Sequence, residues 1–143
     1  MLGARLLVVS LVAAGCAPKL LVSELDPVKS ELRLPDWTEP WNGDTLVVAT
    51  AAVEGTTVTA RPSREQALVR VRYRWEQTPL GKDYLVSLGC DRPRLTIESA
   101  EQAICDRAKG HYFRDVEFRW DRARHAWLAA RVAEGPGAER RAD

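Results

Sequence analysis

The sequence is poor in the residues on which most catalytic and metal sites depend. Its 143 residues include only two histidines, His111 and His125, and three cysteines. Each histidine falls beside an expected turn, which favours a turn or surface position over a general base. The motifs G-x-S-x-G, H-E-x-x-H and S-x-x-K and the P-loop are absent. We therefore expect no enzyme, cofactor or metal ion. Carboxylates far apart in the sequence can still come together in the fold as a catalytic pair. An enzyme of unknown type therefore remains an alternative.

A long apolar run is also absent. A membrane-spanning helix needs about 20 apolar residues, whereas the run from Leu6 to Ala14 has about half that length and contains Ser10. Arg5 precedes this run, and small residues up to Gly15 end it. A charged start, a short apolar stretch and a small-residue end are typical of a secretory signal peptide. We expect residues 1–15 to be removed.

The small residues Ala13-Ala14-Gly15 stand directly before Cys16. This stretch resembles the lipobox of bacterial lipoproteins, with Ala13 where leucine is commoner. The resemblance covers only the first sixteen residues, and no family is assigned to the mature domain. It implies cleavage before Cys16 and acylation there, which would anchor the chain to a membrane. Because Ala17 rather than aspartate follows, it also implies the periplasmic side of the outer membrane. Ordinary cleavage, leaving Cys16 a free thiol, is the alternative.

Neither sign of charge dominates the chain. The sequence has 21 basic and 20 acidic side chains, and the loss of Arg5 with the signal peptide leaves 20 of each. Proteins that bind nucleic acid usually carry a clear basic excess. Together with export, this balance argues against nucleic acid as a partner.

The other two cysteines, Cys90 and Cys105, are 15 residues apart. In an oxidising compartment such a pair is expected to form a disulfide. Closing a loop of this size stabilises a fold by about 3 kcal/mol in the chain-entropy model. A zinc site with His111 and His125 is an alternative, although it lacks the close cysteine spacing of structural zinc sites. Free thiols are a third possibility.

Hydrophobic periodicity and turn residues predict a series of short elements. In chain order they are a helix at 26–35, a loop at 35–44, a hairpin at 45–60 turning at Glu54-Gly55, a strand at 68–76, a turn at 78–83, a strand at 84–90, a helix from Ser99 to Gly110, and strands at 111–120 and 125–133. This series predicts an α+β fold, mainly an antiparallel β-sheet or β-sandwich with one short helix packed on it. The expected organisation is a lipid-anchored N-terminal segment with a tryptophan-containing loop (16–44), a globular β-rich domain (45–134) and a disordered tail (135–143).

The clearest surface feature is a row of arginines in the strand at 68–76. Arg70, Arg72 and Arg74 alternate with apolar residues, so all three should stand on the face away from the core. They could form a solvated face paired with neighbouring carboxylates. They could also bind an anionic partner, because guanidinium groups suit bidentate recognition of carboxylate and phosphate.

Two tryptophans, Trp37 and Trp41, fall in the expected loop at 35–44. Exposed together, they could stack on sugar rings or anchor a partner. Alternatively, they could cover an open end of the core.

Taken together, these features predict a lipid-anchored periplasmic protein of the outer membrane. It would be non-catalytic and would bind an envelope protein as an assembly or stability factor. A small-ligand or glycan-binding module using Trp37 and Trp41 is the alternative.

Overall fold

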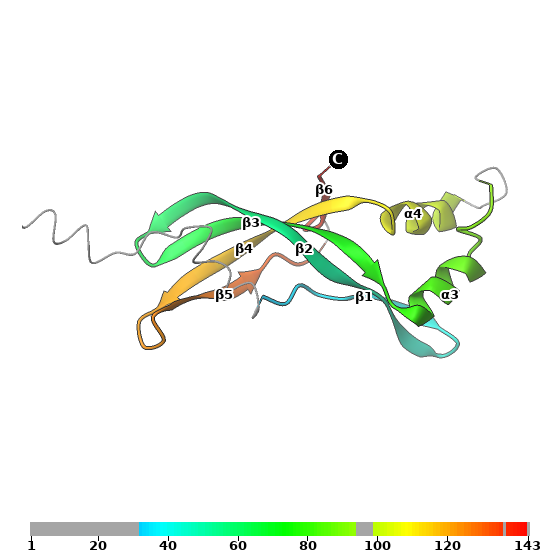
Figure 1. The fold of residues 1–143 in the computed structure, drawn as a ribbon, viewed down its shortest axis with the longest axis horizontal. Coiled ribbons are helices and arrows are strands. Elements are labelled where there is room, and N and C mark those ends of the chain that lie inside the picture. Colours follow the sequence, from blue (N-terminus) through cyan, green and yellow to red (C-terminus); the bar gives the residue numbers. More distant parts are fainter. Residues whose placement is uncertain (1–31, 94–98, 136, 143) are drawn as a thin grey trace, which may run out of the picture.

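The computed structural model describes residues 32–93, 99–135 and 137–142. The signal peptide, Cys16 and most of the expected helix at 26–35 lie outside the described residues. Figure 1 shows an elongated molecule in which long, twisted strands run along its length and two helices lie at one end.

The described residues form one six-stranded antiparallel sheet and two helices, which confirms the α+β class with a mainly antiparallel sheet. In chain order the elements are β1 (Trp37–Trp41), β2 (Asp44–Ser63), β3 (Gln66–Gln77), α3 (Pro79–Ser87), α4 (Ser99–Arg107), β4 (His111–Asp121), β5 (Ala126–Val132) and β6 (Arg140–Arg141). The strands lie in the order β1-β2-β3-β4-β5, and β6 pairs with β4. The strands expected at 68–76, 111–120 and 125–133 are confirmed.

The first two turns differ from the sequence prediction. The expected loop at 35–44 contains β1, which turns into β2 at Asn42 and Gly43, both with positive φ. The expected hairpin at Glu54-Gly55 is wrong, because β2 continues through it with a register shift between Val53 and Gly55. The residues on both sides pair with β3, so this glycine marks a bulge rather than a turn.

The expected turn at 78–83 and strand at 84–90 are also wrong, since helix α3 occupies most of this stretch. Thr78 caps the helix by accepting a hydrogen bond from the backbone N–H of Gly81, and Pro79 opens it. The helix buries Gly81, Tyr84 and Leu85. These positions are three and four residues apart, which is a helical spacing rather than the alternation of a strand.

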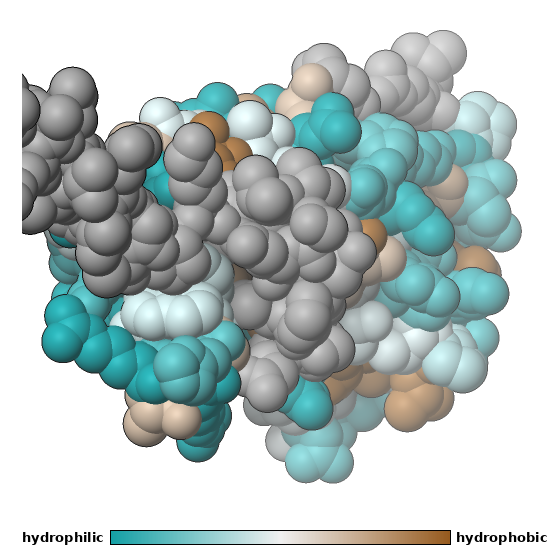
Figure 2. Space-filling view, turned by 60° about the vertical axis from the view of Figure 1, so that its left-hand side comes forward, coloured by the Kyte–Doolittle hydropathy of each residue, from teal (hydrophilic) through white to brown (hydrophobic). Residues whose placement is uncertain are grey.

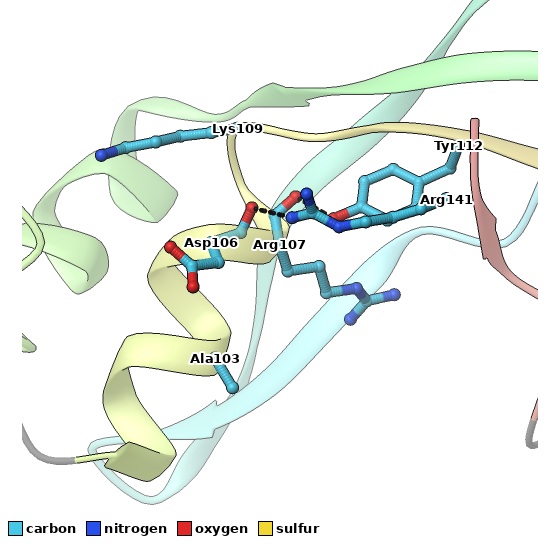
Figure 3. Close-up of a pocket in the computed structure, with 6 residues that line it drawn as sticks. All are labelled: Ala103, Asp106, Arg107, Lys109, Tyr112 and Arg141. Carbon is cyan, nitrogen blue, oxygen red and sulfur yellow. Dashed lines mark hydrogen bonds between the residues drawn. The ribbon is translucent and has the colours of Figure 1, made fainter. Parts of the chain in front are cut away.

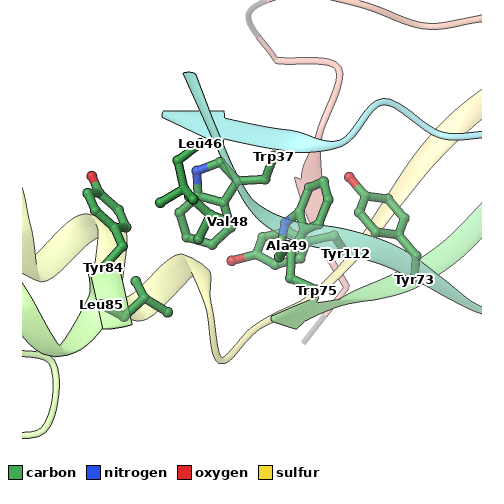
Figure 4. Packing of buried hydrophobic residues seen from close by; sticks show 9 residues of the cluster. All are labelled: Trp37, Leu46, Val48, Ala49, Tyr73, Trp75, Tyr84, Leu85 and Tyr112. Atoms are coloured by element: carbon green, nitrogen blue, oxygen red, sulfur yellow. The ribbon is translucent and has the colours of Figure 1, made fainter. Parts of the chain in front are cut away.

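The alternation predicted in β3 is confirmed. Val69, Val71, Tyr73 and Trp75 are buried, whereas the arginines between them are exposed or half-buried. The core has two clusters. One gathers Leu32, Ala67, Val69, Val71, Val116, Phe118 and Trp127. The other lies toward the helices and contains Trp37, Leu46, Val48, Ala49, Tyr73, Trp75, Tyr84, Leu85 and Tyr112 (Figure 4).

The expected helix at Ser99 is present as α4, and it is tied to the chain that follows α3. A disulfide joins Cys90 to Cys105, as the cysteine count predicted. The bond therefore couples the two helices that lie between β3 and β4.

The expected division of the chain needs correction at both ends. Leu32 and Trp37 are core residues, although both precede the expected domain start at 45. The tail at 135–143 was expected to be disordered, but it forms β6, and the Ala142 N–H donates to the His111 carbonyl at 2.8 Å. The bonds that Glu139 of this tail makes inside the fold are the physical reason.

Candidate functional site

The arginine row lies on the outer face of β3, opposite the core. Arg70 is the half-buried member: its Nε lies 3.4 Å from Asp115 Oδ1, and its guanidinium lies 4.2 Å from the ring centre of Phe113. Both partners belong to β4, the neighbouring strand. Arg70 is thus largely satisfied within the sheet.

Arg72 and Arg74 are in a different situation. Both are exposed, and within the described ranges neither forms an ion pair. Arg72 stands opposite Phe113 in the strand register, and Arg74 stands opposite His111. The nearby Arg140 of β6 lies 5.9 Å from the Phe113 ring centre. This arrangement leaves positive charge available on the outer face.

His111 is paired with a carboxylate of β2. Its Nδ1 lies 2.7 Å from Glu54 Oε1, and the side chain is about half exposed. His125 lies in the β4–β5 turn with a positive φ, as its expected turn position implied. Among the described residues, no three histidine, cysteine or acidic side chains come together as a metal site would require.

The two tryptophans do not form an exposed pair. Trp37 is 2 % exposed, and its ring packs at 5.9 Å from that of Trp75. Trp41 is half-buried and edge-on to Tyr84. Since both belong to β1, four residues apart, strand geometry turns both toward the core. Trp37 therefore has no free ring face for a sugar.

A half-buried carboxylate, Glu139, is bonded to three side chains on the core side of the sheet, and no sequence pattern pointed to it. Glu139 Oε1 accepts hydrogen bonds from Tyr73 Oη at 2.8 Å and from Trp75 Nε1 at 2.9 Å. Glu139 Oε2 accepts one from Arg107 Nε at 2.8 Å. Burial, together with the bond to Glu139, raises the pKa of Tyr73 well above its usual value.

Beside this cluster lies an open cavity of about 560 Å³, lined by Ala103, Asp106, Arg107, Lys109, Tyr112 and Arg141. Figure 3 shows Arg141 lying along Tyr112 and reaching the end of α4, where it donates to the Asp106 carbonyl at 3.0 Å. Tyr112 Oη donates to the Arg107 carbonyl at 2.8 Å. Each of these is a second bond to its carbonyl, because the backbone N–H groups of Lys109 and Gly110 donate to the Asp106 and Arg107 carbonyls at 3.2 and 3.4 Å. Of the lining cations, Arg141 therefore bonds to the end of α4 and Arg107 bonds to Glu139.

Comparison with protein-family models, with curated proteins and with solved structures finds no match to this chain. Function must therefore be argued from the chain itself. In the described part of the chain, no helix is long and apolar enough to span a membrane. Cys16, the expected lipid attachment site, lies outside the described residues.

Proposed function

We propose that this chain is a lipid-anchored, non-catalytic protein on the periplasmic side of the outer membrane. In this proposal it binds an envelope protein as an assembly or stability factor. The lipobox-like sequence ending at Cys16 supports the anchor, and Ala17 supports outer-membrane sorting. The disulfide between Cys90 and Cys105 is in keeping with an oxidising compartment.

The exposed arginines on the outer face carry the binding part of the proposal. Arg72 and Arg74 form no ion pair among the described residues, so their charges are available to a partner. Guanidinium groups recognise carboxylates with fixed, bidentate geometry. An acidic patch on an envelope protein is the chemistry that fits this row.

The character of the surface favours an electrostatic contact over an apolar one. Among the residues coloured in Figure 2, hydrophilic ones predominate, and hydrophobic ones appear in separate areas. Charge complementarity mainly raises the association rate and the specificity of a complex, and it weakens as salt screens the charges. Binding by the arginine row should therefore depend strongly on ionic strength.

Two variants test the anchor and the arginine row separately in intact cells. Cys16→Ser should release the protein from the membrane or leave an uncleaved precursor. Arg72→Ser/Arg74→Ser should stay at the membrane and lose its crosslinked partner. The purified double variant should melt close to the wild type, because exposed charged side chains contribute little to stability.

The matched control is Arg122→Ser/Arg124→Ser, which removes two charges at the turn between β4 and β5. Those arginines pair with Glu65 and Asp121. The control should keep the partner at low salt, and added salt should weaken wild-type binding. A double variant of Arg72 and Arg74 that keeps every partner excludes the row from binding. Normal maturation and membrane retention of Cys16→Ser excludes lipid on Cys16 as the anchor.

A further inference from the structure

The three donors around Glu139 make a well-formed receptor for a carboxylate. Tyr73 and Trp75 bind one carboxylate oxygen and Arg107 binds the other. The Glu139 side chain is only 17 % exposed, so these bonds are largely shielded from water. Hydrogen bonds to an ionised group in such surroundings are stronger than those between neutral groups.

The three donors also have contacts within the core, apart from their bonds to the tail. Tyr73 and Trp75 are 0 % and 4 % exposed, and their rings meet edge-on at 5.4 Å. The Arg107 guanidinium lies 4.5 Å from the ring centre of Trp37 and 5.0 Å from that of Trp75. The Arg107 carbonyl is fixed by Tyr112. The donors would therefore keep their positions if Glu139 left.

The tail itself is held by much less. It follows Gly135 and Gly137, both with positive φ, and its strand β6 has two exposed residues. Glu139 bonds to three side chains of the fold, and Arg141 adds one bond to the end of α4. Segments with few buried apolar contacts open at a lower free energy than the whole fold. Opening of this tail should therefore precede global unfolding.

The tail also uses a stretch of sheet edge that any extended peptide could use. β5 pairs with β4 from Val116 to Asp121, and β6 pairs with the same strand at Tyr112 and Phe113. Adding a strand to an open edge is a common way for a protein to bind a peptide, with side-chain sites giving selectivity. Here the side-chain site selects a carboxylate just before the paired residues.

We propose that Tyr73, Trp75 and Arg107 form a binding site for a glutamate of an extended peptide segment in a partner protein. In the free protein the chain's own Glu139 occupies the site, so the tail acts as an internal competitor. This site lies on the core side of the sheet, opposite the arginine row, and the inference does not rest on the proposed function.

The test uses the full chain with Glu139→Ala and a synthetic peptide of residues 137–142, Gly-Ala-Glu-Arg-Arg-Ala, blocked at both ends. Glu139→Ala should melt lower than the wild type, and the peptide should raise its melting temperature. A peptide with glutamine in place of glutamate should bind about tenfold to a hundredfold more weakly, since it loses the charge-assisted bond. The wild type should respond far less, because its own tail competes at a high effective concentration.

Controls separate this site from the arginine row and from a merely structural lock. Arg107→Ala/Glu139→Ala should lose the response to the peptide, whereas Glu139→Ala combined with Arg72→Ser/Arg74→Ser should keep it. If Glu139→Ala does not fold, hydrogen exchange in the wild type tests the proposal instead. The Ala142 N–H and the Trp75 indole N–H should then exchange faster than the central amides of β3. The proposal is overturned if Glu139→Ala folds but its melting temperature does not change with the glutamate peptide. It is also overturned if the Ala142 N–H and the Trp75 indole N–H exchange only when the whole protein unfolds.

Discussion

Trp75 makes several of the contacts that join the core to Glu139 and Arg107. Its ring packs against Trp37 and Tyr73, its indole N–H donates to Glu139, and Arg107 lies over its face. The side chain is 4 % exposed, although its neighbour Arg74 is exposed. Strand geometry alone separates these two adjacent positions.

Trp75→Ala should therefore unfold the protein at much lower denaturant concentration than the wild type needs. Truncating a buried tryptophan costs about 3–5 kcal/mol, which is a large share of a small domain's stability. Arg74→Ala, one residue away on the outer face, should change the unfolding free energy by less than about 0.5 kcal/mol. Equal losses for the two variants in a urea titration would mean that the two faces of β3 are assigned wrongly.

At this scale the sequence predicts well where a pattern is local. The alternation around Tyr73 was predictable because the residues of both faces of β3 follow one another directly in the sequence. The burial of Trp37 was predicted only as an alternative, because it depends on pairing with β2 rather than on the prolines and Asn42-Gly43 around it. The bonding of Glu139 was not predicted for the same reason, because its three donors lie 32 to 66 residues away in the chain.

Helix α3 shows how a single backbone approach fixes an element on the sheet. The Thr78 N–H donates to the Val48 carbonyl at 3.0 Å, and Thr78 Oγ1 donates to the Val47 carbonyl. A Cβ at Gly81 would stand 1.9 Å from the Val48 carbonyl oxygen. Only glycine allows the first turn of α3 to lie this close to β2.

Gly81→Ala tests this docking because two effects oppose each other. Alanine favours a helix over glycine by about 1 kcal/mol. The overlap with backbone atoms of β2 cannot be relieved by a rotamer change, and overpacking of this kind costs about 1–3 kcal/mol or more. We expect the clash to win and the thermal midpoint to fall. Lys82→Ala, exposed on the same helix, should be nearly neutral, and a stabilised Gly81→Ala would show that α3 does not pack on β2 in this way.

The boundaries of helices and strands were predicted correctly where a local residue signal sets them. They were predicted wrongly where pairing between strands sets them. Ser99, predicted from the sequence to open a helix, is the first residue of α4. The Glu54-Gly55 pair looked like a hairpin turn, but pairing of both flanking runs with β3 outweighs the local preference. The apolar run at 84–90 fits a helix as well as a strand, and the Thr78-Pro79 start was the signal that could have distinguished them.

At the scale of the whole molecule, both chain ends complete the body that the central strands begin. Leu32 contributes to one core cluster from before β1, and Glu139 bonds to the other from the tail. The expected boundaries at 45 and 134 followed composition, which identifies a polar tail but not the buried donors that hold it. Strands β3, β4 and β5 and the disulfide were predictable from local pattern and residue count, whereas the carboxylate site is a property of the assembled fold.

The pKa values of the chain's three tyrosines depend on how the whole fold is packed. Burial is the leading cause that raises the pKa of Tyr73, Tyr84 and Tyr112 above the ordinary value of 10.0, and a hydrogen bond to Glu139 adds to it for Tyr73. As the pH rises through about 10, the unfolded chain loses these phenolic protons before the folded chain does. The folded state then binds more protons, so the unfolding free energy must fall as pH rises.

We therefore expect urea unfolding measured from about pH 8 to about pH 11 to show a stability loss that sets in near pH 10. Each tyrosine that stays protonated in the folded state adds about 1.4 kcal/mol per pH unit to the slope. Tyrosinate absorbance should rise together with the change in tryptophan fluorescence, because ionisation accompanies unfolding. Tyr73→Phe should make the slope shallower by one proton, since phenylalanine has none to lose. Tyrosinate that forms near pH 10 while the tryptophan signal stays native would show that these rings are open to solvent, and it would remove the buried surroundings on which the Glu139 site depends.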